Sequence, residues 1–130
     1  MSNYRIYRSF VLGILISGAA SAPALSHHSF AANFLMNEEI SIVATVKTVR
    51  VANPHSVIFV EVADESGAIV DWTLELGTPT MLRRAGWNGD TLPAGTVITA
   101  IGNPTRSGAP TLALVTILFE DGRELIAPRR

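Results

Sequence analysis

The sequence predicts an all-β fold, a small β-barrel of five strands with one short helix between the third and fourth strands. Three observations predict it. Apolar and polar residues alternate with a period of two in several segments, an Asn-Pro-His breaker separates the first two segments, and a short helical segment follows the third. An antiparallel sandwich is the alternative fold, because the predicted helix is short.

The first strand is predicted over residues 40–51. Even positions carry Ile40, Ile42, Ala44 and Val46, and odd positions then carry Val49 and Val51. Such a change of parity between Lys47 and Val49 indicates a β-bulge or a strand that serves two sheets. A long, bent first strand is what a small closed barrel needs.

The second and third strands are predicted over 56–63 and 68–76, joined by a turn at 64–67. In the third strand Trp72 and Leu74 share one face, while Glu75 lies on the other. Proline stiffens the junction before the second strand, so residues 53–55 end one strand and present His55 at the start of the next.

A helix is predicted over residues 79–85. Thr78 is a suitable N-cap, Pro79 suits the first helical position, and Gly86 stands where a helix would end. The inward side chains are expected to be Met81, Leu82 and Ala85.

The last two strands are predicted over 96–102 and 111–119, with a loop over 103–110 between them. The tail is expected to be loose beyond Ile126. Residues 27–34 read as a loop or irregular arm whose Phe30 and Phe34 pack against the barrel.

This order of elements is that of the oligonucleotide/oligosaccharide-binding (OB) barrel. In that fold the loop between strands one and two and the loop between strands four and five flank the binding face. Those loops carry His55 and Arg106 here. We therefore expect both side chains at one mouth of the barrel.

Residues 1–26 are predicted to be a secretory signal peptide. Arg5 and Arg8 precede an apolar run over 10–20, and small residues follow at positions suited to cleavage before Leu25 or His27. The mature chain, 27–130 for the second cut, would be one soluble periplasmic domain. An uncut N-terminal anchor is the alternative.

The amino-acid composition limits the classes of molecule that the protein is expected to bind. The chain has no Cys, so neither disulfides nor a lipid-attachment thiol is available. Its net charge of −1 becomes −3 when Arg5 and Arg8 leave with the signal. A mildly acidic protein is not expected to bind nucleic acid or an anionic membrane, and no stable membrane anchor remains after cleavage.

The predicted ligand-binding residues are Asn53, His55, Trp72, Glu75 and Arg106. Glu75 ends a strand and can pair with Arg106 or hold a metal beside His55. Trp72 is a candidate ligand platform, although the third strand also needs a large core side chain. The alternative reading makes His55 a turn residue, Glu75 a solvent-facing residue and Arg106 a loop charge.

A second candidate site is metal-binding and uses His27, His28 and His55. If Leu25 is the first mature residue, the free amine, two backbone nitrogens and His27 form a square-planar set that suits Cu(II) or Ni(II). If His27 is first, its amine and ring chelate copper together, and His28 or His55 completes the site. The alternative is a solvated histidine pair that binds nothing.

No catalytic residue is predicted. The chain lacks a nucleophile elbow, a phosphate-binding glycine loop and a His-Glu-x-x-His motif. The adjacent acidic pairs at 38–39 and 64–65 diverge rather than face each other across a cleft, so they do not suit glycoside hydrolysis.

Four motifs in order resemble a family of small exported bacterial proteins known as domain of unknown function 6152. They are HHSFAA at 27–32, NPH at 53–55, WTLELG at 72–77 and LRRAGW at 82–87. The resemblance covers His27 to about Leu125 and implies no established activity. The chain departs from the family at Asn33 and Leu35, where acidic residues are usual, which removes two candidate carboxylate ligands beside His27 and His28.

The sequence thus predicts a soluble, exported, non-enzymatic binding module whose ligand lies near His55, Glu75 and Arg106. One alternative is a copper-binding or copper-dependent redox protein that uses His27, His28 and His55. The other is a structural partner of a periplasmic complex. The expected partner is accordingly a small ligand, a metal ion or a periplasmic protein.

Overall fold

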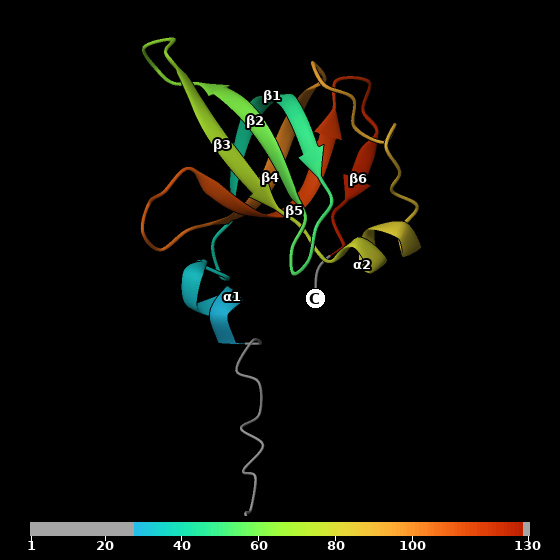
Figure 1. Cartoon of the computed structure of the whole chain (residues 1–130). Coiled ribbons are helices and arrows are strands. Elements are labelled where there is room, and N and C mark those ends of the chain that lie inside the picture. The colour runs from blue at the N-terminus through green and yellow to red at the C-terminus, as the bar shows by residue number, and fades with distance from the viewer. Residues whose placement is uncertain (1–27, 129–130) are drawn as a thin grey trace, which may run out of the picture.

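The computed structural model describes residues 28–128, and within this range it contains two short helices and six strands (Figure 1). In chain order they are α1 (His28–Asn33), β1 (Ile40–Arg50), β2 (Val57–Ala63), β3 (Ile69–Glu75), α2 (Pro79–Arg84), β4 (Val97–Pro104), β5 (Thr111–Phe119) and β6 (Glu124–Ile126).

Strands β1 to β5 form a closed barrel. The strand order is β3-β2-β1-β4-β5-β6, and a further parallel pairing of β3 with β5 closes the sheet on itself. Closure removes the exposed edges that an open five-stranded sheet would have. The predicted all-β barrel is confirmed, with its helix between β3 and β4.

The bulge predicted in the first strand is also present. The pairing of β1 with β2 shifts register between Val46 and Thr48, which leaves Lys47 as the extra residue. The ammonium of Lys47 lies 2.9 Å from Asp71 and 3.3 Å from Glu61 on the outer face of the barrel. The hydrogen bond with Asp71, and to a lesser extent that with Glu61, raises the pKa of Lys47 above its usual value.

The barrel interior is filled by alternate side chains of the strands, and the inward parity changes at the register shifts of β1 and β5. Trp72, Val62 and Phe119 pack at the margin of this core. Its fully enclosed members include Ile58, Val60, Leu74, Ile98, Leu112, Leu114 and Ile117. Burial of this apolar surface is the main force that holds the strands together.

Helix α2 closes one end of the barrel (Figure 1). Thr78 caps it, because its hydroxyl accepts a hydrogen bond from the Met81 amide at 3.4 Å. Gly86 follows the helix with a φ of 84°, a conformation that favours glycine. Leu82 is buried as predicted, but Ala85 is exposed, so the expected inward position of Ala85 is wrong.

Two other predictions are wrong. The segment expected as a loop or irregular arm contains α1, and β4 continues to Pro104 instead of ending at Gly102. The structure also has a strand that was not predicted, β6, which pairs with β5. Ala127 beyond β6 is also fixed, because it is buried and its amide donates to Val115 at 2.9 Å. No helix in the described range is long and apolar enough to span a membrane.

Candidate functional site

Glu75 stands at the seam where the barrel closes. As the last residue of β3, it pairs with Val57 of β2 on one side and with Ala113 of β5 on the other. Its side chain is on the outward parity of β3, opposite to that of Leu74. Two neighbouring strands therefore fix the backbone of a carboxylate that faces out of the barrel.

His55 reaches Glu75 from the loop between β1 and β2. Its Nδ1 lies 3.3 Å from Oε2 of Glu75, and the two side chains are 27% and 28% exposed. An ionised carboxylate only accepts hydrogen bonds, so a hydrogen bond at this contact requires the tautomer or charge state in which Nδ1 carries a hydrogen. The loop and the strand end predicted to converge do so at this pair.

The loop that carries His55 is tied down at its end. Ser56 is fully buried; its amide donates to Gly77 at 3.0 Å, and its carbonyl accepts from the Leu76 amide at 2.8 Å. These bonds continue the pairing of β2 with β3 past Glu75. His55 therefore directly precedes a residue whose backbone is hydrogen-bonded to the segment after β3, and this limits how far the His55 ring can move.

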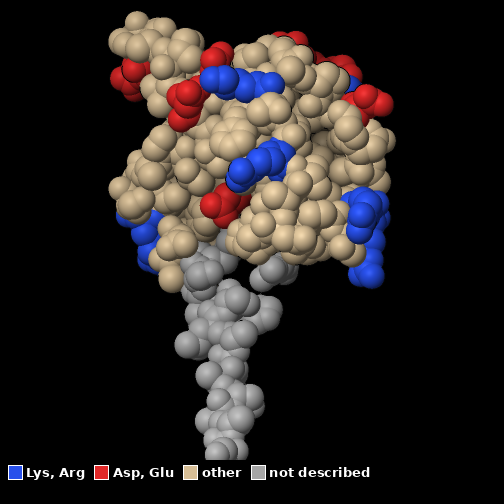
Figure 2. Space-filling model, in the orientation of Figure 1, with Lys and Arg blue, Asp and Glu red and all other residues tan. Residues whose placement is uncertain are grey.

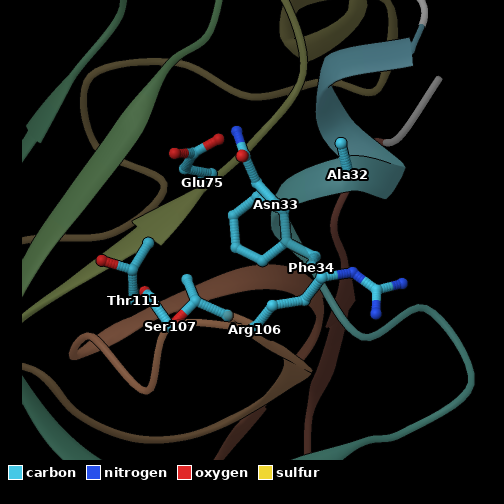
Figure 3. A pocket seen from close by; sticks show the side chains of 8 residues that line it. Ala32, Asn33, Phe34, Glu75, Arg106, Ser107 and Thr111 are labelled. Atoms are coloured by element: carbon cyan, nitrogen blue, oxygen red, sulfur yellow. The ribbon is translucent and has the colours of Figure 1, made fainter.

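Beside Glu75 lies a pocket of about 300 Å³, here called the Glu75 pocket. It is an open space between α1, the end of β3 and the loop that joins β4 to β5. Figure 3 shows the Glu75 carboxylate and the Asn33 amide turned toward each other above the ring of Phe34. The lining residues are Ala32, Asn33, Phe34, Glu75, Thr105, Arg106, Ser107 and Thr111.

Arg106 lines this pocket but directs its charge elsewhere. Its Nε and Nη2 each lie 3.4 Å from the Ala31 carbonyl, and its amide donates to the Asn33 carbonyl at 2.9 Å. Figure 3 shows the guanidinium pointing away from Glu75. The pairing of Glu75 with Arg106 considered from the sequence is not formed. Arg106 instead satisfies carbonyls at the end of α1.

The segment after α1 is fixed to the end of β4, where Phe34 forms a β-bridge with Thr105. The Leu35 amide donates to Pro104 at 2.8 Å, and Phe34 is only 2% exposed. Asn103, which is buried, donates its side-chain amide to the Glu38 carbonyl at 2.7 Å. The α1 wall of the pocket is therefore attached to the barrel by main-chain and buried polar contacts.

Charges on the visible face of the barrel are mixed in sign. Figure 2 shows basic and acidic side chains interspersed over a largely uncharged surface. Lys47 bridges Glu61 and Asp71, and the Arg50 guanidinium lies 5.9 Å from the ring centre of Phe59. This face offers no broad area of one sign, such as a phosphate backbone would need.

Two of the other predicted site residues, Asn53 and Trp72, do not line the pocket. Asn53 is exposed, precedes a cis peptide bond to Pro54, and does not line the pocket. Trp72 has the inward parity of β3 and packs against the core. His27 lies outside the described residues. His28 begins α1, and its side chain is likewise outside the description.

Sequence reasoning missed several pocket residues. Asn33 and Phe34 belong to the arm that was not recognised as a helix, and Thr105, Ser107 and Thr111 belong to a loop and a strand start. For Thr105, Ser107 and Thr111, the only indication in the sequence was that they lie near Arg106 along the chain. Nothing in the sequence linked Asn33 to Glu75.

Within the part of the chain that the structure describes, no three His, Cys, Asp or Glu side chains gather as a metal site would require. His55 and Glu75 together supply two such groups.

Comparison with known proteins gives a family and no more. No curated protein and no solved structure was found that matches the chain. One family matches residues 14–113, a range that includes His55, Glu75, Arg106 and every residue lining the pocket. The chain therefore belongs to the family of unknown function DUF6152.

Proposed function

We propose that the protein is an exported, non-enzymatic binding module that holds a small polar ligand in the Glu75 pocket. The observation that carries the proposal is the His55–Glu75 pair at 3.3 Å, in which both side chains are about one quarter exposed and Glu75 lines the pocket. Partly buried polar groups that converge on a concave site are typical of ligand recognition.

The backbone around the pair also supports binding. Glu75 is paired on both sides, and His55 precedes the buried Ser56. Side chains on a rigid backbone lose little conformational freedom when a ligand binds, so less of the interaction energy is spent on ordering them.

Thermal melts with a panel of small polar compounds test this proposal. We expect at least one compound to raise the melting temperature of the wild type. The rise should be lost in Glu75→Gln and in His55→Ala but retained in Glu65→Gln, which removes the same charge from an exposed turn. His55→Ala by itself should cost no more than about 1 kcal/mol of stability. A rise that survives in both Glu75→Gln and His55→Ala would contradict the proposal.

A metal-binding function is the second candidate. Metal-bound histidines usually donate their other ring nitrogen to a carboxylate, and the Nδ1 contact of His55 with Glu75 has that form. Nε2 would then be the ligand atom. His27 and His28 are the further candidate ligands, on the basis of the sequence alone.

Melts with Cu(II) or Zn(II) separate the two candidates. A metal site predicts that the metal raises the melting temperature of the wild type and not that of His55→Ala, while the two apo proteins melt alike. A polar-ligand site predicts no such metal-dependent difference.

We further propose that the protein is exported to the periplasm, on the basis of the signal-like residues 1–26. The intact mass of protein recovered from the periplasmic fraction should correspond to a chain that starts at Leu25 or His27. A mass that retains residues 1–10 would contradict export with cleavage.

A further inference from the structure

We propose that the Glu75 pocket selects an organic cation, an ammonium group attached to a small apolar body. This inference depends on the binding function proposed above and specifies the chemical class of its ligand.

The formal charges of the lining residues favour a cationic ligand. Among the lining residues only Glu75 and Arg106 carry formal charge, and the Arg106 guanidinium is bonded to the Ala31 carbonyl. Figure 3 shows it directed away from the space that Glu75 faces. A ligand beside Glu75 thus meets one carboxylate and otherwise neutral groups, which favours a cation and disfavours an anion.

The Glu75 carboxylate has an oxygen that can accept a hydrogen bond from such a ligand. His55 contacts Oε2, while Oε1 has no hydrogen-bond partner among the described residues. An ionised carboxylate has several lone-pair sites, and a hydrogen bond from a charged donor to it is stronger than one between neutral groups. An ammonium group can take Oε1 without displacing His55.

Neutral side chains in the pocket can accept hydrogen bonds from the other two N–H groups of the ammonium. An ammonium has three donors and no acceptor, and the Thr111 hydroxyl and the Asn33 side-chain oxygen are acceptors that line the same pocket. Neither side chain hydrogen-bonds to another described residue. Thr105, in contrast, is engaged, because its hydroxyl donates to the Ala109 carbonyl at 2.9 Å.

The apolar lining limits the rest of the ligand. Phe34, which is 2% exposed, and Ala32 are the larger apolar contribution to the lining, and Figure 3 shows the Phe34 ring below the Glu75 carboxylate and the Asn33 amide. A volume of about 300 Å³ is at the small end of the range for small-molecule pockets. The ligand is therefore the size of a single ring or a short chain.

Three probes of nearly equal shape test the charge preference: benzylamine, benzyl alcohol and benzoate. Each is titrated into the full purified protein in EDTA while backbone amide NMR shifts are recorded. Benzylamine should shift the amides of Glu75, Ser107 and Thr111 with the lowest Kd of the three. Glu75→Gln should weaken benzylamine by at least about tenfold, whereas Glu65→Gln should leave its Kd unchanged.

The outcomes separate this inference from the proposed function. If benzyl alcohol or benzoate shifts the same amides as tightly as benzylamine, the pocket binds ligands but the cation preference is wrong. If Glu75→Gln binds benzylamine like the wild type, the preference is equally overturned. If none of the probes shifts these amides, both the inference and the pocket assignment fail. Circular dichroism melts confirm that Glu75→Gln is folded.

Discussion

Replacing Gly102 with alanine is expected to destabilise the protein by about 3 kcal/mol. A Cβ at this position would stand 2.5 Å from the Ala113 carbonyl oxygen and 3.1 Å from the Leu112 Cβ. The neighbour that would have to move is main chain of β5, which is held in the closed sheet.

The position explains why only glycine fits. The pairing of β4 with β5 shifts register between Ile101 and Gly102, so β5 carries an extra residue there and the two backbones approach closely. The melting temperature should fall by roughly 12–24 °C. Gly89→Ala is the matched control, because a Cβ at Gly89 meets nothing within 4 Å. Equal melting of the two variants would contradict the β4–β5 register.

Replacing Leu74 with alanine is expected to cost about 3–4 kcal/mol, since the neighbouring strands hold the cavity open. Leu74 is fully buried and pairs with Ile58 of β2 and Leu112 of β5, the two strands that meet at the closure of the barrel. The free energy of unfolding in urea measures the loss.

Ile69→Ala is the control on the same strand, because Ile69 is 61% exposed. Its substitution should change stability by no more than about 0.5 kcal/mol. A cost below about 1 kcal/mol for Leu74→Ala would mean that β3 does not close against β5.

Much of the barrel was predictable because its strands bury one face. Alternation in β3 and the parity change in β1 follow directly from the period of two, so the register shift at Lys47 was visible in the sequence. Helix α2 was equally predictable, because Thr78 and Gly86 mark its ends with local backbone chemistry.

Helix α1 could not be predicted, because its stability is not local. Its six residues lack a helical apolar period, and its last carbonyls are satisfied by Arg106, which is more than seventy residues away in sequence. Strand β6 is similar, since three residues that pair only with β5 leave little pattern. Long-range contacts of this kind are absent from any local window.

The candidate site likewise has one part that the sequence predicts and one part that depends on long-range contacts. The proximity of His55 and Glu75 followed from strand order, because a loop between β1 and β2 must lie beside the end of β3. The orientation of Arg106 did not follow, since it depends on α1. Without α1, the pocket between Asn33 and Glu75 could not be foreseen either.

The central claim is that ligands bind in the Glu75 pocket, and a crystallographic fragment screen tests it most directly. A library mixed in charge and polarity is soaked into crystals of the protein, and the positions of bound fragments are compared. We expect the fragments to bind between Asn33, Glu75 and Thr111. Fragments that gather instead on the outer face near the exposed Val43 and Ile126, with the Glu75 pocket empty, would contradict it.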